Sequence, residues 1–149
     1  NLPVLDRAAL GAAEGALKGG YVLKDAPNGT PDAIIIATGS EVAIALEATA
    51  LLAADGVTVR VVALPSWELF QQQDAAYREQ VLPAAVKARV AVEAASPFGW
   101  ERYVGEQGRI VGIDHFGASA PAEVLYREFG ITPENVAAQV REVMQITSR

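Results

Sequence analysis

Short apolar runs alternate with helical segments along most of this sequence, and that alternation constrains the fold more than any other feature. Ala33-Ile34-Ile35-Ile36-Ala37 is a continuous apolar run, typical of a strand that is covered on both faces. A helical segment from Glu41 to Asp55 follows, closes at Gly56, and leads into a second strand-like run from Val57 to Leu64. Strand, helix and strand repeated in this way predict an open α/β sheet with helices on both faces, within one domain.

The same alternation continues to the C-terminus. Thr132 precedes Pro133, which predicts an N-cap with proline at the first helical position, and valines at 136, 140 and 143 give that helix an apolar stripe. Residues 7–18 are either a weak helix or a linker, because two glycines interrupt them. The other expected elements are strands at 21–23, 89–93 and 109–113, and helices at 65–73, 74–81, 99–104 and 121–129.

Charge and composition exclude several kinds of partner and site. The 149 residues carry a formal charge of −6 at pH 7, which argues against nucleic acid as a partner. Without cysteine, and with one histidine, the chain has no disulfide framework, thiolate nucleophile or His-rich metal centre. Its longest nearly apolar stretch, Val42 to Ala54, is too short to span a bilayer, and no signal peptide precedes it. We therefore expect no membrane partner and a cytoplasmic location.

The helix expected at 41–55 has large apolar residues around most of its circumference. Such a helix is usually buried on more than one side. The sheet covers one side, so another domain or subunit could cover the other. Alternatively, the many alanines make the helix look more apolar than it is, and both interpretations stay open at this point.

Gly39 and Ser40 are candidate anion-binding residues, because they follow a strand where a helix begins. Open α/β sheets bind ligands outside the carboxyl ends of their strands. Backbone N–H groups at this position could hold a phosphate or carboxylate, helped by the helix dipole. The commoner role of serine here is to cap the helix, and the same applies to Ser66. None of the common phosphate-loop or nucleophile-elbow motifs supports the anion site.

No convincing catalytic set emerges from the other polar residues. His115 is the one imidazole, with Asp114 beside it, but neighbours on an extended segment point to opposite sides. Glu93 and Glu101 could form a pair of catalytic carboxylates across a cleft. The alternative is that Glu93 is held by Arg102 or by backbone N–H groups.

Phe98, Trp100 and Tyr103 are candidate interface residues. They lie in or near a loop that follows a strand, and aromatic side chains are enriched at protein interfaces. The alternative interpretation is that they cover the core of the domain.

A series of short motifs runs in order along the chain and resembles the C-terminal domain of transketolase. The resemblance covers nearly the whole chain, least closely at residues 7–18, and Ala95 stands where the family usually has glycine. The motifs are Gly19-Gly20-Tyr21-Val22-Leu23, Ile36-Ala37-Thr38-Gly39-Ser40-Glu41-Val42, Leu64-Pro65-Ser66-Trp67-Glu68-Leu69-Phe70, Ala88-Arg89-Val90-Ala91-Val92-Glu93-Ala94, Phe98-Gly99-Trp100-Glu101-Arg102-Tyr103-Val104-Gly105 and Gly112-Ile113-Asp114-His115-Phe116-Gly117-Ala118-Ser119-Ala120-Pro121.

The resemblance implies a three-layer α/β/α fold with a mixed five-stranded sheet whose first strand is antiparallel to the rest. By the residues alone, the strand at 21–23 could pair with 34–36 as a hairpin across Asn28-Gly29. The resemblance instead places that first strand elsewhere in the sheet. It divides the chain into an N-terminal linker or helical lead-in, 1–19, and the domain itself, 20–149.

For function, the resemblance implies transfer of a two-carbon ketol unit between sugar phosphates, with thiamine diphosphate and Mg²⁺, in the pentose phosphate pathway or the Calvin cycle. In the family these cofactors lie between two other domains of a homodimer. No catalytic, cofactor-binding or metal-binding residue therefore maps onto this chain, which we expect to be inactive alone. Its expected role is to pack against other domains and a second subunit. The rival hypothesis is a regulatory module that binds small anions at the carboxyl ends of the strands.

Overall fold

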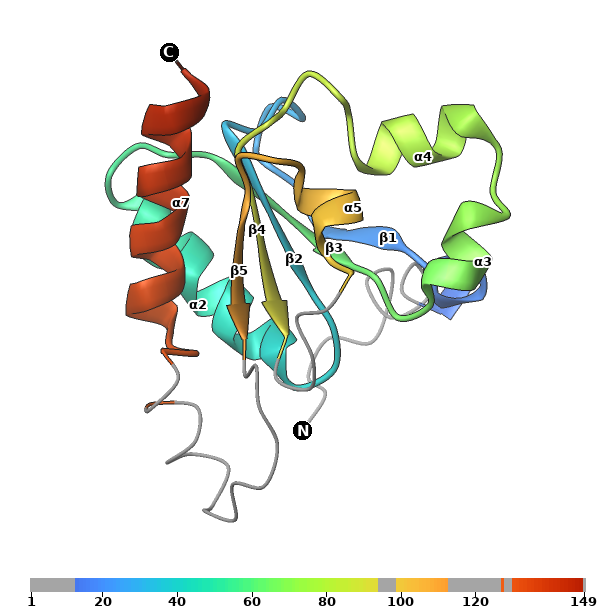
Figure 1. Cartoon of the computed structure of the whole chain (residues 1–149), viewed down its shortest axis with the longest axis horizontal. Coiled ribbons are helices and arrows are strands. Elements are labelled where there is room, and N and C mark those ends of the chain that lie inside the picture. The colour runs from blue at the N-terminus through green and yellow to red at the C-terminus, as the bar shows by residue number, and fades with distance from the viewer. Residues whose placement is uncertain (1–12, 94–98, 113–126, 128–129, 149) are drawn as a thin grey trace.

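The computed structural model describes residues 13–93, 99–112, 127 and 130–148, and centres on a mixed five-stranded sheet (Figure 1). The strand order is β1-β3-β2-β4-β5, and β1 alone runs antiparallel to its neighbour. This confirms the expected fold. The strands are β1 (Tyr21–Lys24), β2 (Ala33–Ala37), β3 (Val59–Ala63), β4 (Arg89–Glu93) and β5 (Arg109–Gly112).

β2 is the central strand, and its sequence explains why. All five of its residues are buried, as a continuous apolar run requires when helices cover both faces. It pairs in parallel with β3 on one side and with β4 on the other. β1 pairs with β3, where Tyr21 lies opposite Ala63, so the hairpin between β1 and β2 does not form.

Two long helices cover one face of the sheet. α2 (Glu41–Ala53) and α7 (Pro133–Thr147) pack side by side, over a core that includes Ile35, Val61 and Val90 (Figure 1). The predicted cap of α7 is confirmed, because the Thr132 hydroxyl accepts the Asn135 N–H at 3.1 Å. Its predicted valine stripe is also buried.

α2 therefore has two covered sides within this chain: the sheet and α7. Its innermost residues include two alanines, Ala45 and Ala48, together with the fully buried Leu52. Larger side chains at Val42, Ile44 and Leu46 lie on its flanks, partly buried against the same core. The apolar circumference is thus explained largely by a neighbouring helix of the same domain, with Leu51 left exposed.

Three short helices lie on the opposite face: α3 (Trp67–Gln71), α4 (Ala75–Val81) and α5 (Glu101–Val104) (Figure 1). They cover the alternate residues of the strands, such as Ile34, Ile36 and Val62. Ser66 caps α3 as predicted, since its hydroxyl accepts the Leu69 N–H at 3.2 Å. The helix expected at 121–129 falls almost entirely outside the described residues.

The lead-in from residue 13 packs on this second face. Residues 13–17 are helical, and Gly19 and Gly20 accept hydrogen bonds from Ser66 N–H at 3.0 Å and Tyr77 O–H at 2.7 Å. Gly19 has φ +81°, and a Cβ there would collide with the backbone of Ser66 and Phe70. The division at residue 19 stays a prediction, but the end of the lead-in lies against the domain. Among the helices described, none is both long and apolar enough to cross a membrane.

Candidate functional site

The carboxyl edge of the sheet holds the predicted anion-binding residues. Gly39, at φ +58°, precedes the start of α2, and the Ser40 hydroxyl donates to the Glu41 carboxylate at 2.6 Å. The predicted serine cap is therefore wrong for Ser40, whose side chain makes no capping hydrogen bond. The N–H groups of Glu41 and Val42 donate to the carbonyls of Thr38 and Gly39. A buried carboxylate from Glu41 already lies at this helix end, so the geometry gives the anion site no support, and it stays a prediction.

Glu93, at the end of β4, accepts a hydrogen bond from the Thr38 hydroxyl at 3.4 Å. The two side chains meet because β2 and β4 are neighbouring parallel strands. Arg102, the partner expected for Glu93, instead lies with its guanidinium 6.0 Å from the centre of the Trp67 ring. Glu101 is exposed. His115 and Asp114 lie outside the described residues.

Trp100 and Tyr103 are buried inside the domain. Their exposed fractions are 2% and 4%, and both pack edge-on against Trp67, with ring centres 4.7 and 5.1 Å from its own. The prediction that they form an exposed interface is not supported, and the alternative, a cover for the core, describes their positions. Phe98 lies outside the described residues. The signal available in the sequence, three aromatics after a strand, does not distinguish the two roles.

Arg89, at the amino end of β4, connects several segments on the second face. Its guanidinium donates to four backbone carbonyls: Val86 at 2.9 Å, Tyr103 at 2.7 Å, Pro83 at 2.8 Å and Leu82 at 3.2 Å. Burial lowers the Arg89 pKa by disfavouring the charged form, and the nearby Glu79 carboxylate opposes that shift. Arg89 thus joins the segment after α4 to the end of α5.

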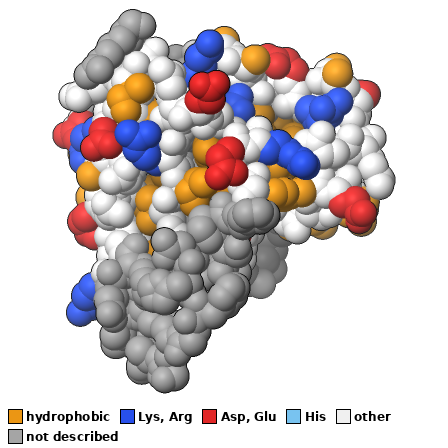
Figure 2. Space-filling model, viewed as in Figure 1, with side chains coloured by type: hydrophobic (Ala, Val, Ile, Leu, Met, Phe, Trp, Pro, Cys, Tyr) orange, Lys and Arg blue, Asp and Glu red, His pale blue; other side chains and the backbone are white. Residues whose placement is uncertain are grey.

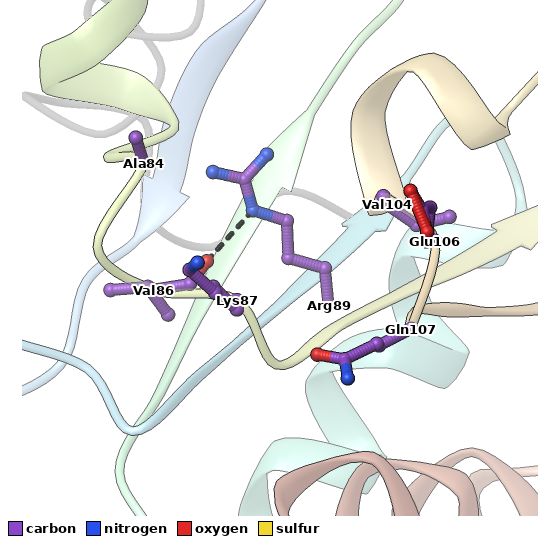
Figure 3. A pocket seen from close by; sticks show the side chains of 8 residues that line it. Ala84, Val86, Lys87, Arg89, Val104, Glu106 and Gln107 are labelled. Carbon is purple, nitrogen blue, oxygen red and sulfur yellow. Dashed lines mark hydrogen bonds between the residues drawn. The ribbon is translucent and has the colours of Figure 1, made fainter. Parts of the chain in front are cut away.

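A hollow of about 460 Å³ lies beside Arg89 at this edge of the sheet (Figure 3). Lys87 and Gln107 belong to its lining, and Arg89 points past Val86 on one side of it. Side chains of both charges line the hollow, because Glu106 lies across from Lys87 and Arg89. This hollow holds no arrangement typical of a catalytic site.

Arg60 on β3 is buried, unlike the half-buried Arg89, and ties together segments that are far apart in the sequence. It forms an ion pair with Asp25 at 2.8 Å and donates to the carbonyls of Gly29, Gln80 and Val81. Burial alone raises the Asp25 pKa. Hydrogen bonds from Arg60 and from the Ala26 N–H, together with the charge of Arg60, outweigh it and hold the pKa below its ordinary value.

We expect the Asp25–Arg60 pair to make folding stability depend on acid pH. Because the folded pKa of Asp25 lies below the unfolded one, its contribution is complete above about pH 5 and disappears as pH falls through the folded pKa. Asp25→Asn should lower the free energy of unfolding by about 1 kcal/mol at pH 7, a small value because Asp25 is 41% exposed. Denaturant unfolding of both proteins from pH 7 to 2.5 measures this. The matched variant Asp55→Asn breaks an exposed pair with Arg141 and should change stability by less than about 0.5 kcal/mol. A pH-independent gap between Asp25→Asn and the original chain would contradict the argument.

The described residues contain no group of three or more His, Cys, Asp or Glu side chains placed to hold a metal ion. The side-chain groups described above are arginines that donate hydrogen bonds to backbone carbonyls and aromatic rings that pack against one another. Both arrangements stabilise a fold, and neither supplies a nucleophile beside a base.

Comparison with known proteins assigns the family. Residues 19–132 match the family model described as the transketolase-like TK C-terminal domain. The chain is 53% identical over 131 residues to the chloroplastic transketolase of Solanum tuberosum, a match that covers 87% of this chain and 18% of that protein. It is 46% identical over 144 residues to the transketolase of Geobacillus stearothermophilus, covering 97% of this chain and 22% of that one.

Solved structures agree. Transketolase from Leishmania mexicana superposes with a TM-score of 0.80 at 45% identity, covering 89% of this chain and 19% of that one. The chain therefore spans about a fifth of the length of the relatives it matches. By its sequence motifs, sheet order and these similarities, this chain belongs to the transketolase-like C-terminal domain family.

Proposed function

We propose that this chain is the C-terminal domain of a longer transketolase, which transfers a two-carbon ketol unit from a ketose phosphate to an aldose phosphate. The observation that carries the proposal is the family match over residues 19–132. It is supported by relatives named transketolase that are 46–56% identical and four to five times longer than the match.

The proposed enzyme uses thiamine diphosphate and a divalent metal such as Mg²⁺, held by other domains. Bound thiamine diphosphate supplies the carbanion chemistry of ketol transfer. The described residues of this chain do not fit the metal, because they bring together no set of metal-ligating side chains. We therefore assign no catalytic step to this chain.

The role proposed for the domain is structural: it packs against the other domains and contributes to a homodimer. Leu17 (78%), Leu51 (40%) and Leu69 (38%) stay exposed on three separate elements, and they are the apolar side chains that we expect such contacts to cover. We keep a cytoplasmic location as part of the proposal, while several relatives named chloroplastic suggest a place in the Calvin cycle.

Assay of the purified chain for ketol transfer tests this function. We expect no transfer and no binding of thiamine diphosphate by the 149 residues alone, and both activities in a longer protein that contains them. Ketol transfer from xylulose 5-phosphate to ribose 5-phosphate, and quenching of protein fluorescence by thiamine diphosphate, are the measurements. Transfer by the chain alone would overturn the structural role. A longer protein without transfer would overturn the assignment as a transketolase.

A further inference from the structure

A groove between α4, the end of α3 and α5 concentrates positive charge on a chain that is otherwise acidic. Its volume is about 540 Å³, and three arginines belong to its lining: Arg78, Arg89 and Arg102. Glu79 is the one acidic residue among the lining residues, whereas the whole chain carries −6. Figure 2 shows Lys and Arg side chains among apolar ones over the region of α4 and α5, with Asp and Glu side chains nearby, and the lining residues themselves carry three arginines against one glutamate. Such a local excess of one sign attracts ligands of the other sign.

The arginines retain hydrogen-bond donors that no described carboxylate satisfies. Arg102 contacts the Trp67 ring, and within the described ranges its guanidinium makes no hydrogen bond. Arg78 donates through Nε to the Gln73 carbonyl at 3.1 Å and through Nη1 to Gln71 at 3.5 Å, which leaves Nη2. Both oxygens of Glu79 accept the Ala84 N–H at 3.2 Å, and its carboxylate acts on the charge of Arg89 without a hydrogen bond to any of the three arginines among the described residues.

A hydrogen-bond network that is buried only at Tyr103 forms one wall of the groove. Gln71 Nε2 donates to the Tyr103 hydroxyl at 2.9 Å, and its Oε1 accepts from Arg78. The Tyr103 hydroxyl therefore accepts this hydrogen bond. Its own O–H stays available as a donor, because the described part of the chain contains no acceptor for it. Arg89 is fixed beside it by its four carbonyl partners. A groove wall that is already ordered loses little freedom when a ligand binds.

We propose that this groove binds a small oxyanion of the phosphate class, either inorganic phosphate or the phosphate group of an ester. Arg102 and Arg78 contact the oxygens directly, and Arg89 adds a fixed positive charge from beneath. Planar guanidinium groups match phosphate oxygens in pairs, which a single ammonium does not. The site lies on the face of α3, α4 and α5, away from Gly39 and Ser40, and it does not depend on the proposed function of the longer enzyme.

Titration of the 149-residue chain with inorganic phosphate at constant ionic strength tests the proposal. Amide resonances of a ¹⁵N-labelled sample should shift saturably around Gln71 and Arg102. Arg102→Gln and Arg78→Gln should each raise the apparent Kd about tenfold or more, as expected for loss of a charge-assisted hydrogen bond. Arg141→Gln is the matched control: it removes the same charge from α7, where Arg141 pairs with Asp55. It should leave the Kd within about twofold, because α7 covers the other face.

A second titration, with glycerol 3-phosphate, distinguishes the two sources of the anion. Tighter binding of the ester identifies a phosphate ester as the ligand, and equal or weaker binding identifies the free ion; either result supports the site. Shifts that rise linearly without saturation, or that persist unchanged in the double variant of Arg78 and Arg102, overturn it. The thermal unfolding midpoint of each variant confirms that it remains folded.

Discussion

Replacing Trp100 with alanine should lower the free energy of unfolding of this chain by about 3–5 kcal/mol, the cost of deleting a large buried aromatic side chain. Trp100 is 2% exposed and lies against Trp67 and Tyr103. Its removal leaves a cavity between α5 and the sheet, because the neighbouring rings are themselves held by other contacts. Denaturant unfolding of the 149-residue chain, followed by far-UV circular dichroism, measures the loss.

Two further variants test whether the loss of stability is specific to the buried aromatic ring of Trp100. Trp100→Phe keeps an aromatic ring and should lose markedly less stability than Trp100→Ala. Leu69→Ala removes a side chain that is 38% exposed on α3 and should cost about 1 kcal/mol or less. If Trp100→Ala left the isolated chain as stable as before, Trp100 would not be a core residue, and the interface hypothesis would regain support.

The second large effect is expected at Arg89. Arg89→Met keeps the apolar stem but removes the guanidinium N–H groups. These groups donate to four backbone carbonyls, at Leu82, Pro83, Val86 and Tyr103. At about 1 kcal/mol for each acceptor, the low end for an unsatisfied group because all four hydrogen bonds are only partly buried, the loss is about 4 kcal/mol. Equilibrium unfolding in urea provides the number, and hydrogen exchange should show the segment after α4 opening first.

Arg109→Met is the matched control for Arg89→Met. Arg109 also lies at the amino end of a strand and donates to backbone carbonyls, but it is partly exposed and pairs with Glu142 at the surface. Its loss should cost about 1 kcal/mol or less. Equal destabilisation by the two variants would mean that the carbonyl network of Arg89 has no special weight in the fold.

Local sequence was enough to predict most of the elements. The run at Ala33–Ala37 predicts a central strand, and Thr132-Pro133 predicts the start of α7, because both depend on side chains acting on their own backbone or on the nearest layer. Ser66 was predicted correctly as a cap for the same reason. Ser40 was not, because its backbone is already helical (φ −70°, ψ −17°) rather than extended as at Ser66, so its side chain does not cap the helix and its hydroxyl donates to Glu41 instead.

The order of the strands needed more than local pattern. A turn at Asn28-Gly29 favours pairing of β1 with β2, and the family resemblance, not periodicity, placed β1 elsewhere. In the structure β1 pairs with β3, and Arg60 links Asp25 just after β1 to Gln80 and Val81 at the end of α4. Contacts across such separations leave no periodic signal in the sequence.

For the same reason, local sequence could not predict which residues line the groove or which aromatics are buried. Arg78, Arg89 and Arg102 lie on α4, β4 and α5, and no spacing rule brings them to one groove. Trp100 and Tyr103 carry the composition of an interface, yet their burial depends on where Trp67 and Phe70 lie after folding.

By itself, the sequence determined the alternation of strands and helices, the acidic charge, the lack of cysteine and, through its motifs, the family. Each of these follows from residues acting locally or in a fixed order. Only the tertiary structure decided that the aromatics after β4 are core, that the Glu41 side chain is buried at the start of α2, and that basic side chains from α4, β4 and α5 share one groove. The physical reason is that burial and charge proximity depend on distances in space, and the packing of helices on the sheet sets those distances.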